Sequence, residues 1–236
     1  MYKYGSLKII FGAMFSYKTT HLLKDIEQIK LINKPFLTFN YFADTRYGYD
    51  IISSHNKVNE NCNMIFKISN IFEHPKYNNA EYIFIDEIQF FKDIVNDIVK
   101  MVETDHKNVI ICGLYSDANR NLFGELYKLI PYADEIRYYK GLCLKCSDGT
   151  PSSFTMKNNK NTPDIIIGGD NIFSSVCRYH YLNDLTVPII NPNANLHINA
   201  DLDSLMKLNP INKDGFMHPN TNEYRNSDPD IENRYS

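Results

Sequence analysis

Short apolar runs that alternate with helical patterns constrain the fold of this chain more than any other feature of its sequence. The runs, rich in Ile, Val and Phe and typical of buried strands, are residues 7–11, 36–39, 82–85 and 109–114. Apolar residues recur at helical spacing in residues 19–32, 94–102 and 123–130. Strands separated by helices need crossover connections, so the sequence predicts an α/β fold with a mostly parallel sheet.

The segment between the first predicted strand and the first predicted helix is typical of a phosphate-binding loop. It consists of Gly12, Ala13, Met14, Phe15, Ser16, Tyr17, Lys18 and Thr19. Backbone N–H groups and a helix N-terminus at this position hold the phosphates of ATP. We expect Lys18 to pair with the β- and γ-phosphates and Thr19 to ligate Mg²⁺. The alternative is an ordinary strand–turn–helix in which the Lys-Thr pair is incidental.

Tyr17 departs from the usual loop, which has Gly directly before the lysine. Gly lets the backbone take φ angles that are costly for a residue with a Cβ atom. A Tyr forced to positive φ at this position costs about 1–3 kcal/mol. Such a loop either forms under strain or binds nucleotide weakly.

Two carboxylates, Asp86 and Glu87, follow the predicted strand 82–85. In an open α/β sheet, ligands bind beyond the carboxyl ends of the strands. Asp86 fits the role of holding Mg²⁺, directly or through water. Glu87 is the better general base for a hydroxyl that attacks a phosphate. The alternative is a solvated acidic turn, which the phosphate loop upstream disfavours.

Three cysteines and a histidine form two pairs with the spacing of metal ligands. Cys143 and Cys146 form one pair, and Cys177 and His180 form the other, about thirty residues further on. Thiolate and imidazole ligands favour Zn²⁺, and four protein ligands predict a structural site. The alternative is three buried thiols and a surface histidine.

The composition excludes several classes of protein. The formal net charge is -3, which argues against a nucleic-acid clamp or a polybasic membrane patch. No apolar run approaches the roughly 20 residues that a membrane helix needs, and the run near the N-terminus is too short for a signal peptide. We expect a cytoplasmic protein with reduced thiols, in which Cys62 and Cys112 act as small apolar residues.

The pattern of the sequence changes twice, which predicts three regions. Residues 1–140 carry the alternating strands and helices of an ATP-binding α/β domain. Residues 141–183 contain short strands, turn residues and the Cys/His pairs, as in a small zinc-binding domain. Residues 184–236 are rich in Asn, Asp and Pro without sustained periodicity, and we expect a disordered tail.

Five strings of the sequence resemble segments of the zinc-containing thymidine kinase family, the type II or non-herpesvirus type. They are residues 12–16 with 18–20, residues 44–47, residues 85–91, the pair Cys143 and Cys146, and residues 167–169 with 176–180. Their order and spacing agree over roughly residues 6–183, which makes the match specific. The resemblance implies a P-loop NTPase-like domain with a zinc-ribbon lasso domain. It also implies ATP-dependent phosphorylation of thymidine or deoxyuridine to dTMP in nucleotide salvage.

The resemblance further implies roles for individual residues. Glu87 matches the catalytic base, and Asp44 and Arg46 match charged residues near the phosphates. We expect the nucleoside pocket to comprise Met14, Gln89, Phe90, Leu114, Ala118, Phe123, Thr155, Ile166 and Phe173. Without the resemblance, Met14 and Leu114 read as core residues, and Arg46 as a member of a surface ion pair. The family's members are commonly tetramers and sometimes dimers, so we expect a homo-oligomer.

Several residues depart from the family pattern besides Tyr17. Ala118 stands where a Phe packs on the thymine, Phe173 where a Tyr is usual, and Lys157 where an Arg is usual. These departures leave open a catalytically impaired homologue that binds nucleotide or only keeps the fold. A third reading, a zinc-ribbon ATPase that acts on nucleic acid, is disfavoured by the acidic balance.

Overall fold

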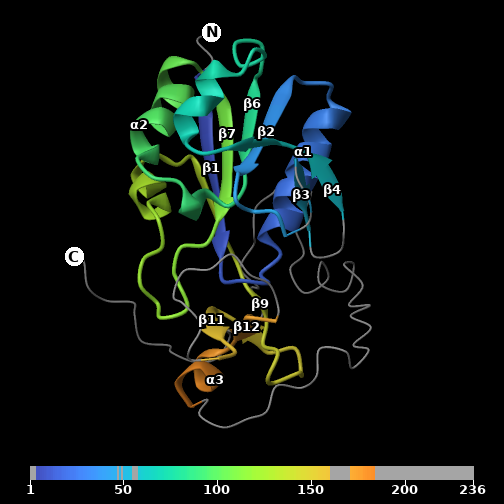
Figure 1. The fold of residues 1–236 in the computed structure, drawn as a ribbon, viewed down its shortest axis with the longest axis vertical. Helices are drawn as coiled ribbons and strands as arrows, with labels where there is room; N and C mark the ends of the chain where they lie inside the picture. The colour runs from blue at the N-terminus through green and yellow to red at the C-terminus, as the bar shows by residue number, and fades with distance from the viewer. Residues whose placement is uncertain (1–3, 47, 49, 55–57, 160–170, 184–236) are drawn as a thin grey trace, which may run out of the picture. The chain divides into compact units, whose positions relative to one another are not determined.

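The centre of the structure is a six-stranded sheet in which all neighbouring strands run parallel (Figure 1). It belongs to a computed structural model that describes residues 4–46, 48, 50–54, 58–159 and 171–183. The strands in spatial order are β5 (Asn63–Ile65), β2 (Phe36–Tyr41), β6 (Tyr82–Ile85), β7 (Asn108–Gly113), β1 (Ser6–Gly12) and β8 (Glu135–Tyr139). The predicted α/β class and mostly parallel sheet are confirmed, with β1, β2, β6 and β7 at the four predicted runs.

Alternate residues of the central strands fill two apolar cores, one on each face of the sheet. Ile9 and Ile83 belong to one core, and Ile10 and Phe84 to the other. Helix α1 (Lys18–Leu31) covers the second core, whereas the first lies under α2 (Ile94–Val99) and the short helices η1 (Ile68–Glu73) and η4 (Leu126–Tyr132) (Figure 1). Strands buried on both faces read as continuous apolar runs, which is why the sequence pattern located them.

Two of the predicted helices are shorter or tighter than expected. The chain at residues 123–130 forms no α-helix: the 3₁₀ helix η4 begins only at Leu126. Gly124 has φ +66, which is not helical, and Pro131 inside η4 has no N–H to donate to an α-helical hydrogen bond. In residues 94–102, α2 ends at Val99 and continues as the π turn η3 (Lys100–Thr104).

Small antiparallel pairs of strands follow the sheet in the chain. They are β9 (Gly141–Leu142) with β10 (Pro151–Ser152), and β11 (Phe154–Lys157) with β12 (Phe173–Val176), followed by helix α3 (Arg178–Asn183). A further pair, β3 (Ile51–Ser53) with β4 (Asn59–Asn61), lies between β2 and β5 in the chain. The predicted tail at 184–236 lies outside the described residues.

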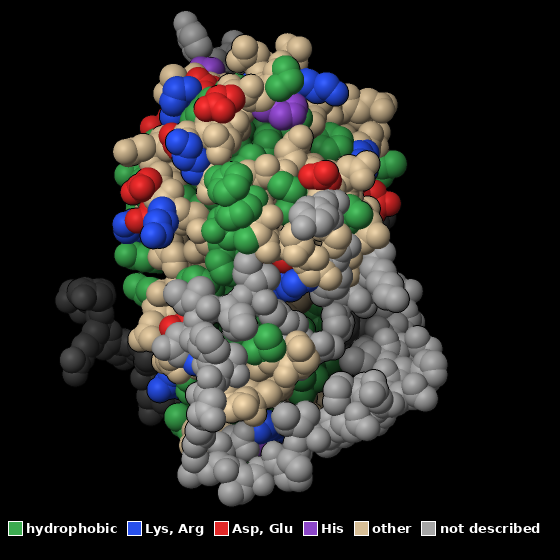
Figure 2. All heavy atoms as spheres, in the orientation of Figure 1, with side chains coloured by type: hydrophobic (Ala, Val, Ile, Leu, Met, Phe, Trp, Pro, Cys, Tyr) green, Lys and Arg blue, Asp and Glu red, His purple; other side chains and the backbone are tan. Residues whose placement is uncertain are grey.

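The described surface carries charges of both signs. Figure 2 shows Lys and Arg side chains interspersed with Asp and Glu on the face that it presents. Within the described residues, no helix is long and apolar enough to cross a bilayer. Cys62 and Cys112 are buried and reduced, as expected of small apolar residues.

His21 of α1 stacks on Tyr139, the last residue of β8. The ring centroids lie 3.8 Å apart with an interplanar angle of 11°. Burial, and then the neighbouring cations Lys24, Lys8 and Arg137, lower the pKa of His21 from 6.5 to about 4. The folded chain therefore favours the neutral imidazole.

Replacing His21 with Phe should remove part of the protein's sensitivity to acid. The pKa of His21 is lower in the folded chain, so the unfolded chain binds the proton first. The resulting stability is complete above about pH 6.5 and is lost as the pH falls toward 4. Between pH 7 and 4.5, we expect the wild type to lose about 1–2 kcal/mol more free energy of unfolding than His21→Phe, after solvent screening. Urea unfolding at both pH values measures the difference, and equal losses would contradict the lowered pKa.

Candidate active site and metal centre

The phosphate loop and the acidic pair meet at the carboxyl edge of the sheet. Strands β1 and β6 both pair in parallel with β7, so the segments that follow them leave the same edge of the sheet on either side of β7. The hydroxyl of Thr19 donates a 3.0 Å hydrogen bond to Oδ2 of Asp86. The charges of Glu87 and Asp86 both act to raise the pKa of Lys18. Four residues from two distant segments of the sequence thus share one site.

Two side chains of the loop donate hydrogen bonds to a single carbonyl oxygen within the loop. The ammonium of Lys18 donates to the carbonyl oxygen of Ala13 at 2.7 Å, and the hydroxyl of Ser16 donates to the same oxygen at 2.8 Å. A Cβ atom on Gly12 would lie 2.2 Å from the carbonyl oxygen of Tyr139 and 2.5 Å from Oγ of Ser16. Only glycine fits at this first position, because one of the atoms in the way is backbone.

Two residues of the loop lie in the left-handed region that favours glycine. Tyr17 has φ 60 and Phe15 has φ 57, so the loop forms with Tyr17 in the strained conformation. Tyr17 is also the N-cap of α1, and its side chain makes no capping hydrogen bond. The first turn of α1 contains no acidic residue. The positive end of the helix dipole is therefore not neutralised from within the helix, which suits it to an anion.

The charged groups of the site are partly removed from water. Burial lowers the pKa of Lys18, and the nearby groups Cys112, Glu87 and Asp86 only partly offset this. Burial, and then the charge of Glu87, raise the pKa of Asp86 to about 7, although the hydroxyl of Thr19 and the N–H of Glu87 favour its ionised form. A ligand that brings both negative phosphates and a cation would compensate both groups at once.

The donor set at Thr19 and Asp86 fits a magnesium ion. A hydroxyl and a carboxylate are the oxygen ligands that Mg²⁺ accepts, at about 2.0–2.1 Å. Adjacent ligands of an octahedron with these bond lengths are about 2.9 Å apart. The observed separation between Oγ1 of Thr19 and Oδ2 of Asp86 is 3.0 Å. The ion could therefore replace the hydrogen bond between them without a rearrangement of the backbone.

Arg46 connects Asp44 to Glu87. Its Nε and Nη2 donate to the two carboxylate oxygens of Asp44 at 2.6 and 2.9 Å, and Nη2 also pairs with Oε1 of Glu87. Burial raises the pKa of Asp44, but the hydrogen bonds and charge of Arg46 outweigh it and leave the pKa lowered. Asp44 is only 6% exposed, so the interpretation of an ordinary surface ion pair does not describe this contact.

The structure joins several of the residues expected in the nucleoside pocket. The N–H of Met14 donates to Oγ1 of Thr155 at 3.0 Å, which ties the phosphate loop to β11. The rings of Phe90 and Phe123 meet edge to face, with centroids 5.4 Å apart. Leu114 follows β7 directly and is half-buried.

The other expected pocket residues are less directly connected. Ala118 is buried, and its carbonyl accepts a 2.7 Å hydrogen bond from the hydroxyl of Tyr181. Phe173 is buried at the start of β12, paired with Lys157 of β11. Ile166 lies outside the described residues.

The sequence did not indicate Tyr41 as a residue of the site. It indicated Gln89, but not the residues to which Gln89 is hydrogen-bonded. Tyr41 ends β2 and stacks on Phe90, with ring centroids 5.2 Å apart and an interplanar angle of 19°. Its position at the carboxyl end of a parallel strand was an available signal. Gln89 is fully buried and bonds to both Glu87 and Leu114, a pairing that no local pattern indicates.

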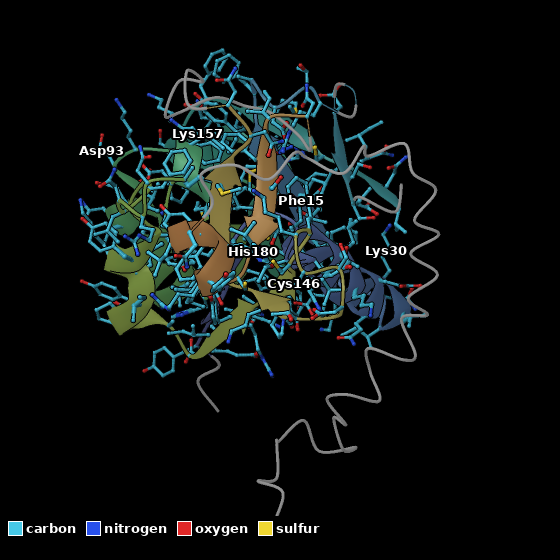
Figure 3. All side chains as sticks on the ribbon, turned by 90° about the horizontal axis from the view of Figure 1, so that it is seen from below. Phe15, Lys30, Asp93, Cys146, Lys157 and His180 are labelled. Carbon is cyan, nitrogen blue, oxygen red and sulfur yellow. The ribbon has the colours of Figure 1, made fainter. Side chains whose placement is uncertain are left out.

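Cys143, Cys146, Cys177 and His180 form the predicted cluster. Their ligand atoms all lie within 4.8 Å of one another. Nδ1 of His180 is 3.5, 3.3 and 3.5 Å from the three sulfurs in chain order, and the sulfurs of Cys146 and Cys177 are 3.7 Å apart. Figure 3 looks onto this end of the described chain, with Cys146 and His180 together and Lys30 and Asp93 toward opposite sides.

These separations fit a tetrahedral metal ion. Zinc bonds of about 2.3 Å to sulfur and 2.0–2.1 Å to nitrogen give edges of about 3.8 Å between sulfurs and about 3.6 Å from sulfur to nitrogen. Burial raises the pKa of Cys143, but backbone hydrogen bonds from Cys177, Cys146 and Lys145 outweigh it and lower the pKa to about 6. A thiolate is the form that binds metal, so this set of residues can hold a metal ion and suits zinc.

Comparison with known proteins matches residues 5–181 to the thymidine kinase family. Thymidine kinase a of Arabidopsis thaliana is 32% identical over 186 residues, which cover 76% of each chain. The thymidine kinase of Amsacta moorei entomopoxvirus is 32% identical over 75% of this chain and 98% of its own. The cytosolic thymidine kinase of Gallus gallus is 30% identical over 75% of this chain and 77% of its own.

An α/β sheet with a loop suited to phosphate and an acidic pair at the same edge is typical of nucleotide-binding enzymes, a class that includes kinases. The match covers most of the sequence, and this chain belongs to the thymidine kinase family.

The metal centre predicts one zinc ion per chain. Cys146→Ala should lose the ion and lower the melting temperature by about 5–10 °C, because a bound structural metal contributes to folding. His180→Cys should keep the ion, since four cysteines form an equally good site. Atomic absorption of the purified chains and thermal unfolding measure both effects. Full zinc content in Cys146→Ala would contradict the ligand set.

Because Tyr17 has a left-handed backbone conformation, its replacement by glycine should change the stability of the protein little. Tyr17→Gly relieves the strain at φ 60 while adding freedom to the unfolded chain, so its stability should stay within about 1 kcal/mol of the wild type. Tyr17→Val should be about 1–3 kcal/mol less stable than Tyr17→Gly, because a β-branched residue at positive φ is strongly disfavoured. Urea unfolding of the three chains measures the order. A glycine variant no more stable than the valine variant would contradict a strained loop.

Proposed function

We propose that this chain transfers the γ-phosphate of ATP to the 5′-hydroxyl of thymidine, or of deoxyuridine, to give the 5′-monophosphate and ADP. The observation that carries the proposal is the convergence of Lys18, Thr19, Asp86 and Glu87 at one edge of the sheet, in a chain of the thymidine kinase family. A homologue that kept only the fold would not need these four groups together.

The phosphate-binding groups come from the loop 12–19 and the start of α1. Lys18 would leave the carbonyl of Ala13 and pair with the β- and γ-phosphates, which restores a partner for its desolvated charge. The free N–H groups at the start of α1 would donate to the same phosphates. Thr19 and Asp86 would hold Mg²⁺, which would neutralise negative charge on the phosphates.

Glu87 would act as the general base. Its carboxylate takes the proton of the 5′-hydroxyl as the oxygen forms a bond to the γ-phosphorus. The bond from that phosphorus to the bridging oxygen breaks at the same time, and ADP leaves with the electron pair. Arg46, held by the buried carboxylate of Asp44, would stabilise negative charge on the transferred group.

The nucleoside would bind on the same side of the sheet as Glu87. The proposed pocket comprises Met14, Phe90, Leu114, Ala118, Phe123, Thr155, Ile166 and Phe173. Phe90 is its best-supported member, because its ring is fixed between Tyr41 and Phe123. An aromatic ring held in this way can stack on a base with little loss of side-chain entropy.

The proposal also includes the role of the metal centre, the oligomeric state and the location of the protein in the cell. The metal centre would be a structural zinc site within a lasso domain at 141–183, separate from the ATP-binding domain at 1–140. A homo-oligomer, a tetramer or dimer, is supported by the exposed Ile136 and Tyr138 on the edge strand β8. The chicken relative is a cytosolic enzyme, and we propose a cytoplasmic location for this chain.

Removing the base should stop the transfer without preventing nucleotide binding. We expect Glu87→Gln to lower kcat by about 10²–10⁴-fold, because general-base catalysis contributes about that much. The affinity for ATP should change little, since the phosphates are held mainly by the loop. Transfer of labelled phosphate to a panel of nucleosides measures activity, and calorimetry measures binding.

Glu103→Gln is the matched control, because Glu103 is exposed on the π turn η3. It should keep wild-type activity. Full activity of Glu87→Gln would remove Glu87 from the proposed role. A wild-type chain that phosphorylates no nucleoside in the panel would overturn the proposed function.

A further inference from the structure

Gln89 lies two residues after the proposed base and is buried beneath it. Its side chain donates a hydrogen bond to Oε2 of Glu87 and accepts one of 2.8 Å from the N–H of Leu114. Glu87 has φ 53 and is followed by the 3₁₀ turn η2 (Ile88–Phe90), which brings Gln89 back toward the carboxylate. Both residues therefore move with one short turn at the end of β6.

The orientation of the Gln89 amide is fixed by its partners. The N–H of Leu114 can only donate, so the amide oxygen must face it. The NH₂ group is then directed at Glu87, whose ionised carboxylate can only accept. Because Leu114 directly follows β7, the central sheet determines which way the amide points.

Two glycines make room for Gln89 and leave none to spare. A Cβ atom on Gly113 would lie 2.3 Å from Oε1 of Gln89. A Cβ atom on Gly124 would lie 2.4 Å from the carbonyl oxygen of Gln89. The amide oxygen of Gln89 therefore lies against Gly113 and its backbone against Gly124, where a larger residue would collide with each.

Gln89 and Glu87 differ in how much of the side chain a ligand can reach. Gln89 is 2% exposed, so a nucleoside has almost no surface of it to contact. The side chain of Glu87 is 16% exposed and can be reached. The other contact of this carboxylate, Arg46, has a side chain that is 24% exposed and comes from the segment between β2 and β3. Gln89 is thus the more deeply buried of the two contacts.

We propose that Gln89 is a positioning residue for Glu87: its buried amide, oriented by the N–H of Leu114, holds Oε2 and so fixes the direction in which the carboxylate meets the 5′-hydroxyl. The proposal rests on the proposed function for its catalytic consequence, although not for its geometry. It replaces the expectation that Gln89 contacts the nucleoside. The role requires the amide donor at this position and not merely a side chain of similar volume.

Two variants separate the hydrogen bond from packing. Gln89→Met keeps the length of the side chain and removes both hydrogen bonds. Gln89→Glu keeps the volume and the acceptor for Leu114, but presents an oxygen in place of the donor to Glu87. We expect each to lower kcat by about 10- to 100-fold, the cost of a misplaced catalytic group, with KM for thymidine and ATP within about twofold of the wild type. Gln28→Met, at an exposed site on α1, is the control and should behave as the wild type.

A third variant displaces the side chain of Gln89 by enlarging a neighbouring residue. Gly113→Ala places a methyl group where the amide oxygen lies and should lower kcat in the same way. All activities are expressed per folded chain, with the folded fraction taken from thermal unfolding. A raised KM for thymidine at unchanged kcat would mean that Gln89 contacts the nucleoside and would overturn the proposal. Unchanged kcat per folded chain would also overturn it.

Crystal structures of the wild type and Gln89→Met, both without ligands, test the geometry independently of activity. We expect the Glu87 carboxylate to rotate away from its wild-type position in Gln89→Met. An unmoved carboxylate overturns the positioning role whether or not the wild type is a kinase. A rotated carboxylate, in a protein whose wild type phosphorylates no nucleoside, supports the positioning role and overturns the proposed function alone.

Discussion

The site depends on opposite charges that the fold holds close together and partly out of water. Burial disfavours the charged forms of both Lys18 and Asp86. Cys112, Glu87 and Asp86 raise the pKa of Lys18, and the N–H of Glu87, Cys112 and Thr19 favour the ionised form of Asp86. The hydrogen bond from Thr19 to Asp86 is the direct link between the two segments. Such a cluster gains most from a ligand that carries charges of both signs. A metal-bound triphosphate is a ligand of this kind, so the charges of the site are consistent with the proposed transfer of phosphate from ATP.

Three residues at the same edge of the sheet carry backbone strain. Phe15, Tyr17 and Glu87 all have positive φ although none is glycine, and each contributes an unfavourable free energy of about 1–3 kcal/mol. The neighbouring elements hold these conformations in place, since β1 and β6 are largely buried and Leu22, Leu23 and Ile26 of α1 pack in the core. The positive φ of Glu87 turns the chain at the end of β6, and its side chain contacts Arg46 and Gln89.

The region after β8 is tied to the phosphate loop at more than one point. The N–H of Met14 bonds to Thr155, and a Cβ atom on Gly141 would lie 2.3 Å from the carbonyl oxygen of Phe15. The four metal ligands join the chain near β9 to the start of α3 and so close the segment that carries Thr155. A metal at this centre would stabilise the arrangement of the pocket without touching the reacting groups.

The sequence by itself determined the buried strands β1, β2, β6 and β7, the helix α1, the loop with its strained Tyr17 and the four metal ligands. Each of these follows from side-chain periodicity, backbone sterics or ligand spacing within a short segment. Only the tertiary structure decided the strand order, which puts β7 between the two catalytic segments, and the edge strands β5 and β8, which are short or alternate with polar residues. It also decided that Gln89 is buried beneath Glu87 and that Tyr41 stacks on Phe90. Contacts between distant segments depend on how the strands pair across the sheet, and no local pattern specifies that pairing.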